Sequence, residues 1–132
     1  MKTKLSIAAV GLGMLLASVP AIAHHSFAAE FDAAKPIKLT GSVTKVEWMN
    51  PHTYFYIDVK DEKGTVTNWG LEMGSPNGLM RQGWTRNSMK IGDVVTVEGS
   101  AAKDGSNIGN ARSVTLSSGQ RLFAGSSQNT TP

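Results

Sequence analysis

Hydrophobic and polar residues alternate along much of the chain in short runs, which is typical of β-strands with one buried face. The alternation is clearest after Pro51, where Phe55, Ile57 and Val59 share one face. The opposite face carries polar and aromatic side chains, namely His52, Tyr54, Tyr56 and Asp58. We therefore predict a strand here with its apolar face in the core. The same pattern predicts strands at residues 37–49, 65–73, 93–101 and 107–116, and a short edge strand at 121–123. In the strand at 107–116, Ile108, Val114 and Leu116 are in phase and are expected on its apolar face.

The predicted first strand changes phase along its length. Leu39 and Val43 are apolar at odd positions, whereas Val46 and Trp48 are apolar at even ones. A strand with a period of two residues keeps both pairs on one face only if an extra residue lies between them. We therefore expect a β-bulge or a sharp bend between residues 41 and 45.

The alternation stops at Gly74. Ser75 followed by Pro76 is the usual opening of a helix, and Gly78 and Gly83 keep that helix short. Three strands, one short helix and two or three further strands are the order of a small, mainly β, five- to six-stranded OB-like barrel. The chain has no cysteine, so no disulfide can hold an open sheet together. This favours a closed barrel over the alternative, an open β-sandwich.

The first 23 residues have the composition of a secretory signal peptide. Lys2 and Lys4 precede an apolar run at residues 7–18 that is too short to span a membrane, and Ala21-Ile22-Ala23 is a small-residue cleavage signal. An uncleaved membrane anchor is the alternative. The chain then divides into a signal peptide at 1–23, an N-terminal arm at 24–36, an OB-like β-barrel domain at 37–124 and a disordered tail at 125–132.

Two features of the N-terminal arm predict its local structure. Phe27 and Phe31 lie four positions apart, so they can share one face of a helical turn. Pro36 disfavours the helical conformation at Lys35, so residues 32–36 are expected to form a turn.

The net charge of the mature chain bears on which binding partners are expected. The chain has 13 Lys and Arg and 10 Asp and Glu, but two lysines leave with the signal peptide, so 11 basic residues face 10 acidic ones in the mature chain. A net charge of +1 gives no support to nucleic acid as a partner. We expect a bacterial periplasmic or secreted protein with no membrane span after cleavage. Its expected partner is a small molecule, a metal or a periplasmic protein.

Five short motifs are spread over the predicted mature chain. They are His-His-Ser-Phe-Ala-Ala-Glu-Phe-Asp at 24–32, Asn50-Pro51-His52, Gly74-Ser75-Pro76-Asn77, Gly83-Trp84-Thr85-Arg86 and Lys103-Asp104-Gly105. Together they resemble a family of small secreted bacterial proteins classed as a domain of unknown function. The resemblance implies export and one domain. It supplies no activity and no catalytic residues.

The three histidines, His24, His25 and His52, are the strongest candidates for chemistry. If cleavage follows Ala23, His24 becomes the N-terminal residue, and its α-amine and imidazole can chelate one metal ion. A second imidazole, from His52 or from His25, completes a three-nitrogen site suited to Cu(II), which resembles the histidine brace of secreted copper proteins. Cleavage after Ala21 instead places His24 third, an arrangement that also binds Cu(II) or Ni(II). The alternative is that these histidines are structural, with His52 hydrogen-bonded at the adjacent proline corner.

Zinc suits these residues less well, because no Cys or carboxylate is an evident fourth ligand, although Asp58 and Glu47 can approach. Tyr54 and Tyr56, with Asp58, form a second candidate site, since exposed aromatic residues on a barrel face can stack on sugars or bases. Their alternative role is packing beneath a loop or the N-terminal arm.

Enzyme signatures are absent from the sequence. It contains no Gly-x-Ser-x-Gly elbow, no His-Glu-x-x-His helix and no carboxylate pair on neighbouring strand positions, so we predict that the protein is not an enzyme. We therefore predict an exported small binding protein that binds Cu(II) through His24 and His52. The alternative is a ligand- or protein-interaction module that uses the Tyr54/Tyr56 face without a metal.

Overall fold

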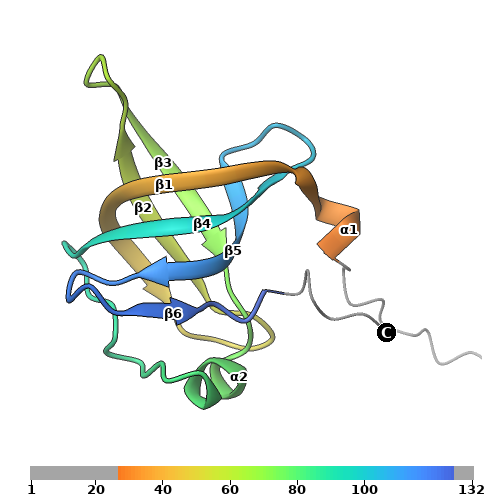
Figure 1. Cartoon of the computed structure of the whole chain (residues 1–132), viewed down its shortest axis with the longest axis vertical. Helices are drawn as coiled ribbons and strands as arrows, with labels where there is room; N and C mark the ends of the chain where they lie inside the picture. The colour runs from red at the N-terminus through yellow and green to blue at the C-terminus, as the bar shows by residue number, and fades with distance from the viewer. Residues whose placement is uncertain (1–26, 127–132) are drawn as a thin grey trace, which may run out of the picture.

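The computed structural model describes residues 27–126, which fold around one closed β-sheet (Figure 1). The predicted order of three strands, a short helix and two or three further strands is confirmed, with three strands after the helix. The predicted signal peptide lies outside the described residues. The elements are α1 (Phe27–Glu30), β1 (Phe31–Glu47), β2 (Tyr54–Lys60), β3 (Val66–Glu72), α2 (Pro76–Arg81), β4 (Val94–Ala102), β5 (Ile108–Thr115) and β6 (Arg121–Phe123).

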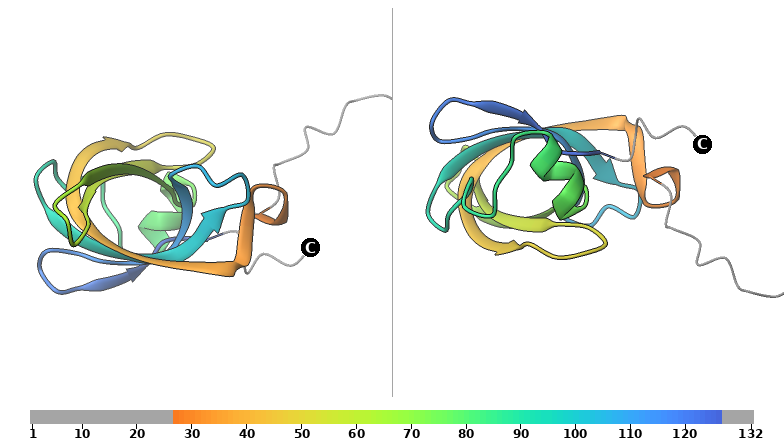
Figure 2. Two further views of the ribbon diagram at one scale, coloured as in Figure 1. Left: turned by 90° about the horizontal axis from the view of Figure 1, so that it is seen from above. Right: turned by 90° about the horizontal axis from the view of Figure 1, so that it is seen from below.

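The sheet closes on itself. Neighbouring strands pair antiparallel in the order β3-β2-β1-β4-β5-β6. A further, parallel pairing joins β3 to β5, with Gly70 opposite Ile108 and Glu72 opposite Asn110. It makes a ring of β1, β2, β3, β5 and β4, seen end-on in Figure 2 with α2 at one mouth. The predicted OB-like barrel is confirmed, and closure removes sheet edges that a chain without disulfides must protect.

The change of phase in β1 is a β-bulge. Val43 pairs with Ile57, but Lys45 pairs with Tyr56, so one residue of β1 has no counterpart on β2. The extra residue lies within the expected segment 41–45. As a result Val43 is buried and Val46, of the other parity, also packs against the core.

The start of β1 differs from the prediction. Residues 32–36, expected to form a turn, are part of the strand, which begins at Phe31. Pro36 lacks only the backbone N–H that a strand uses, and the pairing register slips between Phe31 and Pro36, so the irregular stretch tolerates this loss. Within the described residues the predicted arm is reduced to the single turn α1. There Phe27 packs on Phe31 as expected, with ring centroids 5.7 Å apart.

The core is filled by the inward-facing residues of the ring. Ile108 was predicted to be one of them, but it is 44% exposed. On β5, Ala111 lies opposite Gly99 and Ser113 lies opposite Glu98, so an extra residue reverses the alternation in the first half of the strand. The side chains with no exposed surface include Phe55, Ile57, Leu71, Leu79, Val97 and Val114.

The fold extends past the predicted end of the barrel domain at residue 124. The backbone N–H of Ala124 donates to the carbonyl oxygen of Arg112, and its own carbonyl oxygen accepts from the N–H of Gly74. Ser126 is buried and its hydroxyl group donates to Oδ1 of Asn110. Residues 125 and 126, which the sequence placed in the tail, therefore belong to the barrel.

α2 begins as predicted. Ser75 is the N-cap and its Oγ accepts a hydrogen bond from the N–H of Gly78, while Pro76 occupies the first helical turn. After the helix, Trp84 is buried and its Nε1–H donates to the carbonyl oxygen of Phe123 at 2.8 Å. This bond ties the segment after α2 to β6.

Candidate functional site

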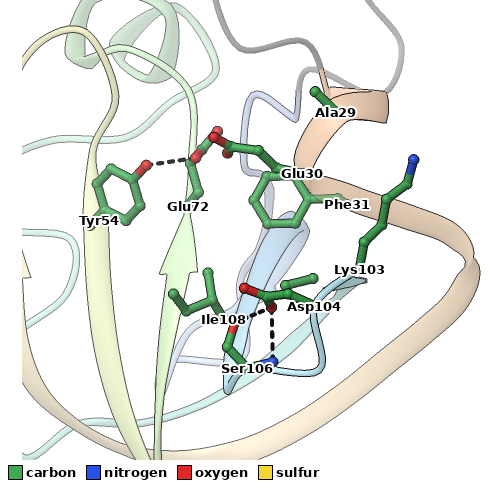
Figure 3. A pocket seen from close by; sticks show the side chains of 10 residues that line it. Ala29, Glu30, Phe31, Tyr54, Glu72, Lys103, Asp104, Ser106 and Ile108 are labelled. Carbon is green, nitrogen blue, oxygen red and sulfur yellow. Dashed lines mark hydrogen bonds between the residues drawn. The ribbon is translucent and has the colours of Figure 1, made fainter.

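A pocket of about 440 Å³ lies at the end of the barrel that α1 borders (Figure 3). We call it the α1 pocket. Its walls come from α1, the start of β2, the end of β3 and the connection from β4 to β5. The volume falls in the range of small-molecule sites. The pocket is lined by Ala29, Glu30, Phe31, Tyr54, Glu72, Ala102, Lys103, Asp104, Ser106 and Ile108.

α1 is held against the pocket by the β4–β5 connection. The N–H of Lys103 donates to the carbonyl oxygen of Glu30 at 2.9 Å, and the Lys103 Nζ donates to the carbonyl oxygen of Ala28. The packing of Phe27 on Phe31 joins the helical turn to the start of β1. These contacts place Glu30 and Phe31 at the pocket wall.

Glu72 is the central polar residue of the pocket. It lies opposite Tyr54 in the β2–β3 register, and the Tyr54 hydroxyl group donates to Glu72 Oε2 at 2.6 Å. The other oxygen, Oε1, lies 3.4 Å from Nδ1 of His52. This carboxyl group therefore lies between a phenol and an imidazole, and Glu72 is only 5% exposed. The pKa of Tyr54 is raised above its usual value. The largest cause is partial burial of the hydroxyl group, and the hydrogen bond to Glu72 and the negative charge of its carboxylate add to it.

Two further carboxyl groups face this pocket. Figure 3 shows the Glu30 carboxyl group beside that of Glu72, and its charge adds to the rise in the Tyr54 pKa. Asp104 accepts hydrogen bonds from the backbone N–H of Ser106 at 2.9 Å and from its hydroxyl group at 2.6 Å. These bonds to the charged form lower the pKa of Asp104 below its usual value.

The structure brings some of the predicted site residues together and separates others. His52 and Tyr54 both contact Glu72. Tyr56 shares the face of β2 with Tyr54 but lies outside the pocket, where the Lys45 Nζ is 5.3 Å from its ring centroid.

The remaining candidates lie elsewhere. Asp58 accepts a hydrogen bond from Asn68 Nδ2 at 2.8 Å, and Glu47 pairs with Lys45. The predicted metal ligands His24 and His25 lie outside the described residues. Between residues 27 and 126, no group of three or more His, Cys, Asp or Glu side chains is arranged to hold a metal ion. None of the helices in this part of the chain is long and apolar enough to cross a membrane.

Sequence reasoning did not identify Glu72 or Glu30 as site residues. A signal for Glu72 was available, because the turn at residues 61–64 fixes the register of the β2–β3 hairpin and so places Tyr54 opposite Glu72. The position of Glu30 had no such local signal, since it depends on contacts with Lys103 far along the chain.

The chain belongs to a family of unknown function, DUF6152, whose model matches residues 12–111. This confirms the resemblance to a domain of unknown function that the sequence motifs indicated. No curated protein matches the chain. Among solved structures, the chain resembles the crystal structure of the mitochondrial single-stranded DNA binding protein Rim1 from S. cerevisiae, with 12% sequence identity and a TM-score of 0.49. That match covers 62% of this chain and 92% of the other.

Proposed function

We propose that this member of the DUF6152 family is an exported small binding protein that binds Cu(II). The proposed ligands are the α-amine and imidazole of His24, which becomes the first residue if the signal-like segment at 1–23 is removed, and the imidazole of His52. Three nitrogen donors suit Cu(II), which prefers imidazole and amine ligands in a tetragonal arrangement. The proposal is of binding without catalysis.

The observation that carries the proposal is the position of His52 beside Glu72. Histidines that bind metals commonly direct the other ring nitrogen to a carboxylate, which fixes the tautomer and the ring orientation. The Glu72 Oε1 atom lies 3.4 Å from Nδ1 of His52. A proton on Nδ1 would face this carboxylate and leave the lone pair of Nε2 for a metal. The Tyr54 hydroxyl group holds the second oxygen of Glu72 in place.

The proposal requires the chain before α1 to reach His52. The described residues begin at Phe27, and α1 borders the same pocket as Glu72. Two residues, His25 and Ser26, lie between His24 and Phe27, so three extended residue steps, about 10 Å, are available. Within residues 27–126 no group of three or more His, Cys, Asp or Glu side chains is arranged to hold a metal ion, and the proposal takes its other two donors from His24.

The test is a Cu(II) titration of processed protein whose N-terminal residue has been verified by mass spectrometry. We expect one copper per chain and a Cu(II) spectrum with nitrogen hyperfine splitting. His24→Ala and His52→Ala should each abolish stoichiometric binding. His25→Ala is the matched control, and it separates His52 from the alternative second imidazole. Glu72→Gln should weaken binding about tenfold, because it removes the carboxylate that orients His52.

One variant addresses the amine alone. A single residue added before His24 leaves every side chain in place but moves the α-amine away, so it should abolish the three-nitrogen spectrum. Copper binding that is indifferent to this extension, to His24→Ala and to His52→Ala would overturn the proposal.

The second candidate function is an interaction module, and one observation favours it. Tyr54, predicted as a ligand-stacking residue, lines the α1 pocket, which is large enough for a small molecule. Tyr56 and Asp58 do not line it. Ligand screening should therefore give hits that are lost in Tyr54→Ala and retained in Tyr56→Ala, whereas the copper site takes no donor atom from either ring.

A further inference from the structure

The α1 pocket has one apolar wall. Phe31 is almost fully buried, and its ring is fixed by the contact with Phe27. Ala102 and Ile108 continue this wall, and Ile108 is 44% exposed because the bulge in β5 turns it out of the core. A wall of this kind can receive the hydrocarbon body of a small ligand.

The charge of the pocket opposes that of the chain as a whole. Its lining includes three acidic residues, Glu30, Glu72 and Asp104, and one basic residue, Lys103. The Lys103 Nζ donates to the carbonyl oxygen of Ala28, and Figure 3 shows it directed away from the carboxyl groups. The full sequence carries a net charge of +3, so a negative pocket is a local feature rather than a consequence of composition. Such a site attracts cations and repels anions.

Glu72 has capacity for another hydrogen-bond donor. It is 5% exposed, and a buried carboxylate is costly unless donors or cations surround it. A carboxylate has about four lone-pair sites. Tyr54 occupies one of them at 2.6 Å, and His52 lies at the longer distance of 3.4 Å. An ammonium group, which has up to three donors, can bind in this position and also be attracted by Glu30 and Asp104.

We propose that the α1 pocket binds a small organic amine in its protonated form, with the ammonium group at Glu72 and the apolar body against Phe31 and Ile108. This rests on the second candidate function, that the pocket is a ligand site. The amine site shares Glu72 with the proposed copper site but needs neither His24 nor His52. The carboxyl groups in residues 27–126 are not arranged to enclose a metal ion. An ammonium group needs no such closed coordination, because each of its donors makes a separate hydrogen bond.

The test uses three ligands with the same phenyl-ethyl body and different heads. Phenethylamine carries a positive charge, phenethyl alcohol is neutral, and phenylacetate carries a negative charge. They are titrated into metal-free mature protein, in the presence of a chelator, and followed by amide NMR shifts and calorimetry. We expect phenethylamine to shift the amide signals of Glu72, Asp104 and Ile108. The alcohol should bind at least about tenfold more weakly, and phenylacetate should not bind, because each lacks the charge that pairs with a buried carboxylate.

Variants connect this binding to the pocket. Glu72→Gln should weaken amine binding at least about tenfold. The amide NMR spectrum of this variant shows whether it keeps the native fold. Ile108→Trp fills the apolar wall at an exposed position, so it tests the pocket without touching the buried carboxyl group, and it should abolish binding. Glu62→Gln removes an exposed acid in the β2–β3 turn and is the matched control, with no expected change.

The outcomes separate the two functions. His24→Ala removes the proposed copper site and should leave amine binding unchanged, so loss of copper binding alone does not affect this inference. Equal binding of phenethylamine and phenylacetate, no binding of any amine at millimolar concentration, or amine binding that is indifferent to both Glu72→Gln and Ile108→Trp would overturn it.

Discussion

The hydrogen bond between Tyr54 and Glu72 makes a quantitative prediction about stability. Tyr54→Phe removes one hydroxyl group and leaves the ring in place. The Tyr54 hydroxyl group donates at 2.6 Å to a carboxyl group that is 5% exposed, and Tyr54 itself is partly buried. Hydrogen bonds to charged groups contribute about 1.5–3 kcal/mol, so we expect the free energy of unfolding to fall by about 2 kcal/mol. For a domain of this size the melting temperature should fall by about 10 °C.

Tyr56 provides a matched control on the same strand and the same face. Within residues 27–126 its ring packs against Gly70 and beneath Lys45, and its hydroxyl group makes no hydrogen bond. Tyr56→Phe should therefore change the free energy of unfolding by less than about 0.5 kcal/mol.

Both variants are measured by urea unfolding, followed through tryptophan fluorescence. Trp84 is 2% exposed in the native barrel and reports its opening. The midpoint of Tyr54→Phe should fall while the slope stays that of the wild type, because the surface exposed on unfolding is unchanged. Equal losses for the two variants, or a loss below about 0.5 kcal/mol for Tyr54→Phe, would refute the claim that this hydroxyl group holds Glu72 in place.

Three further predictions follow from other parts of the barrel. A Cβ atom at Gly99 would lie 1.9 Å from the carbonyl oxygen of Asn110, so Gly99→Ala should lower the free energy of unfolding by at least about 3 kcal/mol in urea titrations. Thr53 is fully buried and its hydroxyl group has no partner among the described residues, so Thr53→Val should raise the melting temperature, through a gain of about 1 kcal/mol. The Asp104 carboxyl group should titrate below its usual pKa of 3.8 by NMR, so its stabilising effect is present above pH 3.8 and lost as the pH falls through the native pKa. Ser106→Ala should return that pKa toward 3.8, and an unchanged pKa would contradict the assignment.

Much of the fold could be predicted because its signals are local. The alternation of hydrophobic and polar residues identified the strands. The bulge in β1 was predicted from the apolar pairs on either side of it, which have opposite parity. The bulge in β5 left no such signal, because Ala111 and Ser113 are small and fix no phase, so Ile108 was assigned to the wrong face. Residues 32–36 were predicted to form a turn because Pro36 disfavours the helical conformation at Lys35. That restriction is equally compatible with an extended strand, and irregular pairing accommodates the proline.

The candidate site was predicted only in part. His52 and Tyr54 stand out in the sequence, and the structure joins them through Glu72. Glu30 reaches the same pocket because Lys103 bonds to the backbone of α1, a contact between residues 75 positions apart in the case of Ala28. No local sequence pattern encodes a contact at that separation. The pocket therefore cannot be predicted from the sequence and is recognised only in the closed barrel.

The long strand β1 also determines when the barrel can form. One of its edges pairs with β2 and the other with β4, where Leu39 lies opposite Val97, and the ring is completed only when β5 joins β3 at Ile108. Pairings so distant in sequence make folding slow, since the chain must lose the entropy of long loops before it gains their contacts. A chain that ends before Ile108 leaves the edges of β3 and β4 open. During synthesis, a stable barrel can therefore form only after nearly the whole polypeptide has been made. Truncated products carry unpaired strand edges that favour aggregation.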